Sequence, residues 1–107
     1  MILISKYIVP KGYTGLTLFP FIFLKRKELL LNKILVNHEK IHLRQQLELL
    51  IIPFYLLYII EFIIRYLKLN DWQQAYRSIS FEREAYKNDT NLKYLKNRPF
   101  WNFINYF

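Results

Sequence analysis

The stretch Asn37-His38-Glu39-Lys40-Ile41-His42 decides the fold, because the strongest helical pattern of the chain runs through it. It holds the only two histidines among 107 residues, spaced four apart. Apolar residues recur around it at intervals of three and four, a spacing typical of one buried helix face. We expect this helix to begin between residues 28 and 33, with Asn32 as its N-cap. Pro53 should end or kink it.

The spacing of the two histidines suits a bound metal ion. Positions i and i+4 of an α-helix lie on one face, one turn apart, so His38 and His42 can ligate the same zinc. Glu39 projects about 100° further round the helix, so it would flank the metal instead of binding it. In sites of this H-E-x-x-H type, zinc lowers the pKa of a bound water and the carboxylate takes its proton. We therefore predict Zn²⁺ as the cofactor and Glu39 as a general base, if a third ligand exists.

The sequence has no cysteine, so the third ligand must be a carboxylate. The acidic residues outside the motif are Glu28, Glu48, Glu61, Asp71, Glu82, Glu84 and Asp89. Glu48 should point away from the histidine face, and Glu61 lies in an apolar segment, where we expect a buried, paired carboxylate. Glu82 and Glu84 lie together on a later predicted helix. That helix can return across the histidine helix and place one glutamate at the metal.

The composition indicates a single domain over residues 1–107. Hydrophobic residues make up 53% of the chain, and its net charge is +8. We find no basic helix face and no nucleic-acid-binding motif, so a nucleic-acid partner is not expected. A basic protein also suits an anionic membrane surface. Residues 1–10 do not form a signal peptide, and the expected location is therefore cytoplasmic or membrane-associated.

Residues 49–67 form the most apolar segment of the chain. The segment is nearly long enough to cross a membrane but contains Pro53, Glu61 and Arg65. We interpret it as a helix that is either part of the core or packed against a bilayer. In the second case Trp72 and Trp101 are candidates for the membrane interface.

The remaining segments indicate an α+β fold. Residues 1–11 and 16–24 are rich in β-branched and aromatic side chains, and Pro20 marks an edge strand or a bulge. Asn70-Asp71 is a predicted turn, and helices are predicted over residues 72–88 and 92–97. The predicted architecture is a short N-terminal β-hairpin or edge strand packed on a bundle of three to four helices.

Two motifs together resemble a known family. The H-E-x-x-H helix, followed by Glu82-Arg83-Glu84-Ala85-Tyr86, resembles the gluzincin-type zinc metallopeptidases, and most closely very small, minigluzincin-like bacterial proteins. The similarity extends over most of residues 14–88. It implies a zincin-like minimal core with Glu82 as the third zinc ligand and Glu84 as the runner-up.

The chain departs from that family in two respects. Tyr86 replaces an aspartate that usually supports a ligating histidine, so Asn37, Gln45, Gln46 or a backbone carbonyl would take its place. The chain also has no room for the second subdomain that completes the substrate cleft. The resemblance implies a transition-state stabiliser as well, and Tyr76 and Arg77 are the candidates.

Two functions follow as predictions. The first is a zinc metallopeptidase that cleaves peptide or protein substrates, aligned by the edge strand above the metal. The second is a non-catalytic zinc-binding protein in peripheral contact with a membrane. The substrate, the physiological role and the oligomeric state stay open.

Overall fold

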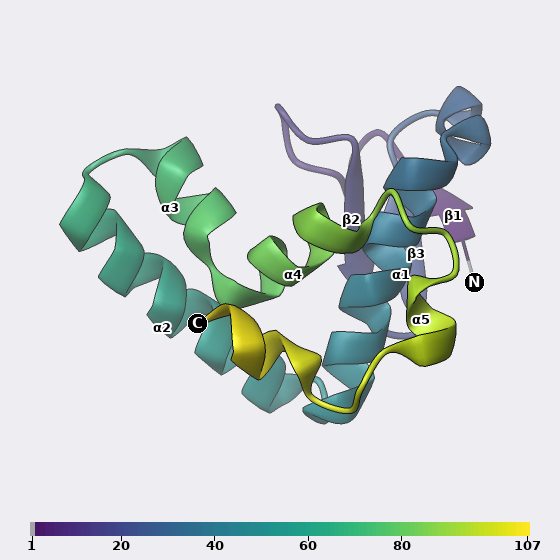
Figure 1. Cartoon of the computed structure of the whole chain (residues 1–107). Helices are drawn as coiled ribbons and strands as arrows, with labels where there is room; N and C mark the ends of the chain where they lie inside the picture. Colours follow the sequence, from purple (N-terminus) through teal and green to yellow (C-terminus); the bar gives the residue numbers. More distant parts are fainter. Residues whose placement is uncertain (1) are drawn as a thin grey trace.

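The structure, a computed structural model, describes residues 2–107 and has an α+β fold (Figure 1). It contains strands β1 (Ile2–Ile4), β2 (Gly15–Leu18) and β3 (Phe21–Leu24) and helices α1 (Lys33–Glu48), α2 (Ile52–Leu69), α3 (Trp72–Ser78), α4 (Ser80–Asn88) and α5 (Tyr94–Asn97). Two 3₁₀ helices, η1 (Lys27–Leu31) and η2 (Asn102–Tyr106), complete it. The predicted α+β class is therefore confirmed, but within residues 2–107 the sheet has three strands instead of a hairpin, and there are five α-helices instead of three to four. Met1, the first residue of the predicted N-terminal strand, lies outside the described residues.

The three strands form one small sheet in the order β1-β3-β2. β1 is parallel to β3, whereas β2 and β3 form an antiparallel hairpin. The interpretation of Pro20 as an edge or bulge residue was wrong, because Pro20 lies in the turn between β2 and β3. A turn position suits a residue that cannot donate a backbone hydrogen bond. Because β2 is the last strand in the sheet order, it is an edge strand, and it packs against α1.

Helix α1 follows the sequence prediction closely at its start. Asn32 is the N-cap, and its side chain accepts a hydrogen bond from the backbone N–H of Leu35 at 3.1 Å. The C-terminal end differs, because α1 stops at Glu48 and Pro53 lies in the first turn of α2. A proline fits there, since the first N–H groups of a helix have no intrahelical partner. Leu50 and Ile51 have positive φ angles of 60° and 65°, and the two helix axes differ by 114°.

The predicted helix over residues 72–88 is divided into α3 and α4. The chain is extended at Ile79 (φ −60°, ψ 137°), and α4 starts in a new direction at Ser80. Glu61 of α2 stabilises this start, because its carboxylate accepts hydrogen bonds from the Ser80 N–H at 2.6 Å and the Ser80 hydroxyl at 2.7 Å. Glu61 is buried and also pairs with Arg65, as expected from the sequence.

The hydrophobic core lies between α2, α4 and the C-terminal η2. Phe54, Ile79, Phe81 and Phe103 are almost fully buried and contact one another. The aromatic tail therefore packs on the helices and closes this side of the domain (Figure 1). The break at Ile79 lets α4 pass close to α1, so the glutamates of α4 approach the histidine face.

No single helix within residues 2–107 is long and apolar enough to cross a membrane. The bent pair α1 and α2 meets the criterion only when the two helices are taken together.

Candidate metal centre

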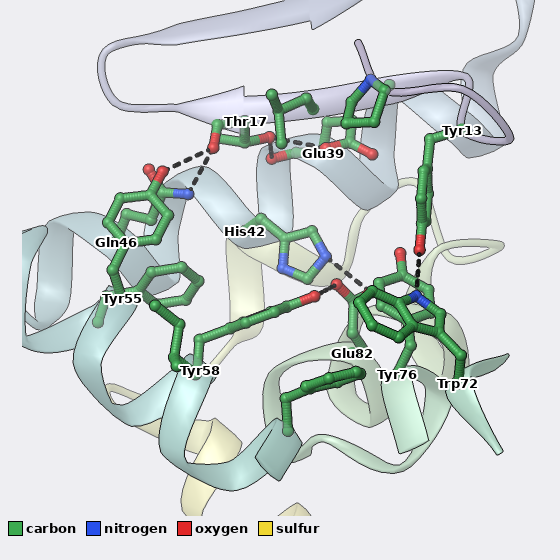
Figure 2. Close-up of a pocket in the computed structure, with 16 residues that line it drawn as sticks. Tyr13, Thr17, Glu39, His42, Gln46, Tyr55, Tyr58, Trp72, Tyr76 and Glu82 are labelled. Atoms are coloured by element: carbon green, nitrogen blue, oxygen red, sulfur yellow. Dashed lines mark hydrogen bonds and ion pairs between the residues drawn. The ribbon is translucent and has the colours of Figure 1, made fainter. Parts of the chain in front are cut away.

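Two histidines of α1 and one glutamate of α4 meet in the interior. His38 Nε2 lies 3.1 Å from His42 Nε2, and Glu82 Oε1 lies 3.3 Å from the first and 3.1 Å from the second. The three residues are only 4–6% exposed. They form a buried group that could hold a metal ion. The structure thus brings together the three predicted ligands, and Figure 2 shows His42 facing Glu82.

The separations between these atoms fit a small tetrahedral ion. Ligand atoms at 2.0–2.1 Å from a tetrahedral zinc lie about 3.3 Å apart. The three observed distances, 3.1, 3.1 and 3.3 Å, agree with this triangle. Two imidazole nitrogens and one carboxylate oxygen form a donor set that suits zinc and leaves a fourth position open.

The other nitrogen of each imidazole has its own partner. His38 Nδ1 lies 3.1 Å from Asp89 Oδ2, and His42 Nδ1 lies 2.8 Å from Gln45 Oε1. Both partners are acceptors, so both Nδ1 atoms donate, and both Nε2 atoms face the centre. This tautomer is the one that a metal ion requires.

Among the expected replacements for the missing family aspartate, Gln45 takes this role for His42. The partner of His38, Asp89, was missed in the sequence. A sequence signal existed, because Asp89 follows Glu82 by seven residues, which is about two helical turns, and therefore continues its face. Asn37 and Gln46 have other roles. Asn37 donates to the backbone carbonyls of Asp89 and Asn91, at 2.9 and 3.0 Å, and fixes the turn after α4.

Glu84, the runner-up ligand, does not face the metal centre. It is fully buried and forms an ion pair with Arg98, which also pairs with Glu48 at 2.6 Å. Gln45 Nε2 donates to Glu84 Oε1 at 2.9 Å and to the Phe81 carbonyl at 3.1 Å. These two bonds orient the Gln45 amide so that its oxygen faces His42. Glu84 thus supports a ligand from behind, through Gln45.

Close contact shifts the pKa values of His42 and Glu82 in opposite directions. Burial alone would lower the pKa of His42, but the nearby Glu82 carboxylate outweighs it and raises this pKa to about 9. Burial raises the pKa of Glu82, and the two histidines outweigh it, so this pKa lies well below its usual range. At neutral pH His42 is therefore protonated and Glu82 is ionised. A metal ion that binds here would have to displace the proton from His42.

Two tyrosines border the centre. Tyr58 of α2 donates its hydroxyl to Glu82 Oε2 at 2.6 Å, which leaves Oε1 for the histidine side (Figure 2). No sequence pattern indicated this role, because Tyr58 lies in the apolar segment. Burial, followed by the charge of Glu82, raises the pKa of Tyr58 and of Tyr76, so both remain hydrogen-bond donors at neutral pH.

Glu39 is buried between α1 and the edge strand. The Thr17 hydroxyl donates to Glu39 Oε1 at 2.8 Å and contacts the Glu39 carbonyl oxygen at 3.0 Å (Figure 2). A Cβ atom added at Gly15 would lie 3.1 Å from Glu39 Oε2. A side chain at this position of β2 would therefore press on the carboxylate.

Two pockets, of about 360 and 380 Å³, meet at this carboxylate. Both are lined by Tyr13, Gly15, Glu39 and Tyr76. The first also reaches His42 and Glu82, and the second reaches His38. Tyr76, one of the two candidate stabilisers, therefore lines both pockets. Arg77 lines neither pocket, and its guanidinium lies 3.7 Å from the centre of the Tyr86 ring.

Strand β2 presents backbone groups to the first pocket. Lys25 donates its N–H to the Thr14 carbonyl, so in the β2–β3 ladder the peptide groups of Gly15 and Thr17 point to the free edge. Gln46 and Tyr55 bind the Thr17 carbonyl at 2.8 and 3.0 Å. The N–H and C=O of Gly15 and the N–H of Thr17 are therefore the groups that the edge offers.

No protein-family model, no curated protein and no solved structure matches this chain.

Proposed function

We propose that the protein is a zinc-dependent peptidase with a zincin-like minimal core. The observation that carries the proposal is the buried triangle of His38, His42 and Glu82, with both Nε2 atoms directed inward, beside a glutamate at the junction of two pockets. Two histidines and one glutamate on three protein positions are a donor set that catalytic zinc sites use. When bound, zinc would activate a water molecule and polarise the scissile carbonyl.

Glu39 is the proposed general base. Thr17 binds its Oε1 atom, so Oε2, the oxygen nearest to Gly15, is available to accept a proton. The carboxylate follows a ligating histidine directly and lines both pockets, so a water at the fourth metal position would lie within its reach. The proton can then pass to the leaving amine.

The substrate we propose is an extended peptide that pairs with β2. Gly15 and Thr17 offer backbone donors and an acceptor at the free edge, and this edge borders the pocket that contains His42 and Glu82. The rest of that pocket is mainly apolar and aromatic, with lining residues that include Leu16, Phe54, Tyr55, Tyr58, Ile59, Phe62 and Trp72. A bulky apolar side chain next to the scissile bond fits such a lining. The Tyr76 hydroxyl, held protonated, would donate to the developing oxyanion.

The proposal is tested with Glu39→Gln. The zinc-loaded protein is incubated with a mixture of peptides, and products are identified by mass spectrometry. Metal content is measured in parallel. We expect the wild type to bind one zinc and to cleave, and the variant to keep its zinc but lose at least about 100-fold in rate.

The matched control is Glu28→Gln, because Glu28 is an exposed acidic residue of η1 and lines neither pocket. It should cleave like the wild type. A wild-type protein that holds zinc and cleaves no peptide would support the non-catalytic zinc-binding function instead. A protein that binds no zinc would contradict both.

A further inference from the structure

Helix α2 packs on the domain through aromatic residues and the buried Glu61, and its outer side is aliphatic. At about 100° per residue, one arc of about 160° carries only aliphatic side chains and Pro53. This outer face of α2 consists of Ile52, Leu56, Leu57, Ile59, Ile60, Ile63, Ile64 and Leu67. The charged pair Glu61 and Arg65 lies on the opposite side, against the domain. A surface helix of a soluble domain has the reverse arrangement.

The outer face of α2 is not covered by the rest of residues 2–107. Its eight side chains are between 39% and 77% exposed. The helix contacts the domain through Phe54, Tyr58 and Phe62 on its inner side, and it lies at the outside of the molecule (Figure 1). A continuous aliphatic face of this length is the kind of surface that marks a binding site for another apolar body.

The remaining surface is strongly basic. Among residues 2–107, thirteen of the sixteen lysines and arginines are exposed, whereas Glu28 and Asp71 are the only exposed acids. The carboxylates at the metal centre, in the Arg98 ion pairs and at the start of α4 are internal. Folding therefore removes most of the negative charge from the surface. The excess of positive charge on the surface is larger than the net charge of +8 indicates.

We propose that α2 docks flat on an anionic lipid bilayer, with its outer face in the boundary between headgroups and acyl chains. An uncharged aliphatic face combined with a basic surface fits a negatively charged bilayer. A second copy of the chain offers the apolar face but brings the same positive charge, so charge opposes that pairing. The helix lies in the membrane plane, since neither α2 nor any other single described helix can span.

Docking in this orientation places the first pocket next to the lipid. Ile59 belongs to the outer face of α2 and also lines that pocket, together with Trp72, which is 59% exposed. Trp72 follows the C-terminal end of α2, where a tryptophan suits the membrane interface. At the other end, the Trp101 indole donates to the Glu48 carbonyl at 3.3 Å, next to the turn that leads into α2. A tryptophan from another part of the chain thus lies next to each end of α2.

The test is co-sedimentation of the full chain with vesicles. Neutral phosphatidylcholine vesicles are compared with vesicles that contain about 30% phosphatidylglycerol. We expect at least tenfold tighter binding to the anionic vesicles, and a loss of binding as salt concentration rises. The double variant Leu56→Glu/Ile60→Glu, at the centre of the outer face, should bind at least tenfold more weakly than the wild type.

The matched control is Tyr7→Glu/Leu31→Glu, because both residues are 86% exposed and lie outside α2. It adds the same charge and should keep at least half of the binding. Circular dichroism checks that both variants are folded. Equal binding by the two double variants would overturn the proposal, since the basic surface alone would then suffice. The wild type could instead fail to bind anionic vesicles and form a dimer that Leu56→Glu/Ile60→Glu dissociates. This result would overturn the proposal and identify a second copy of the chain as the partner. Because no turnover is measured, these results do not depend on the proposed peptidase activity.

Discussion

Replacing Asp89 by alanine should weaken zinc binding by 10- to 100-fold. Asp89 Oδ2 accepts the Nδ1 proton of His38 at 3.1 Å, and both residues are less than 10% exposed. Without the carboxylate, the ring loses its fixed orientation and its nitrogen loses a basic partner, and losses of this kind cost about 10- to 100-fold in metal affinity. That range corresponds to about 1.4–2.7 kcal/mol.

The fold should survive this substitution, because the turn after α4 is held independently. Asn37 binds the backbone carbonyls of residues 89 and 91, not the Asp89 side chain. Zinc affinity is measured by competition with a chromogenic chelator at fixed pH. Asp89→Asn serves as the control, since it keeps an acceptor oxygen and loses only the charge, and its loss should stay below tenfold. Wild-type zinc affinity in Asp89→Ala would refute the role assigned to the Nδ1 contact.

Three further predictions concern the Gly15–Glu39 approach, the protonation of His42 and the hydrophobic core. Gly15→Ala should push the Glu39 carboxylate aside and slow hydrolysis at least tenfold with zinc content unchanged. Peptide cleavage and metal analysis measure these two quantities. A fully active variant would contradict the close approach of Gly15 to Glu39. Zinc must displace the proton that Glu82 helps to hold on His42, whose pKa is about 9. Apparent zinc affinity should therefore rise about tenfold per pH unit from pH 7 towards 9 and level off above it, whereas a flat profile in titrations at several pH values would exclude this competition. Phe54→Ala, in the centre of the core, should lower the free energy of unfolding by about 3–5 kcal/mol. A denaturant titration measures this change. A loss under about 1 kcal/mol would show that the core is not arranged as described.

The sequence determined the features that depend on neighbouring residues. The start of α1, its Asn32 cap and the shared face of His38 and His42 all follow from helix geometry over a few residues. The same holds for the α+β class, because strand-prone and helical segments can each be recognised locally. The choice of Glu82 over Glu84 came from the family resemblance, and the structure places Glu82 at the histidines.

One predicted helix is divided, and one candidate residue lies outside both pockets, because of contacts with more distant parts of the chain. Helix 72–88 has helical periodicity throughout, but Glu61, about twenty residues earlier, binds the Ser80 N–H and stabilises a new helix start there. Arg77 shares a helix with Tyr76, yet it lies over Tyr86 and outside both pockets. Neither contact has a signal in the residues around it.

The support of the metal centre was decided by tertiary structure alone. Asp89 behind His38 and Tyr58 behind Glu82 come from elements far apart in the chain, as does the Arg98–Glu84 pair that orients Gln45. Local geometry fixes which side chains share a helix face, and the sequence shows this directly. The partner that such a face meets depends on where the chain turns back, and here the break at Ile79 sets that direction. The spacing H-E-x-x-H therefore specified that His38 and His42 share one face, whereas the fold brought Glu82 to them and supplied the residues that hold all three in place.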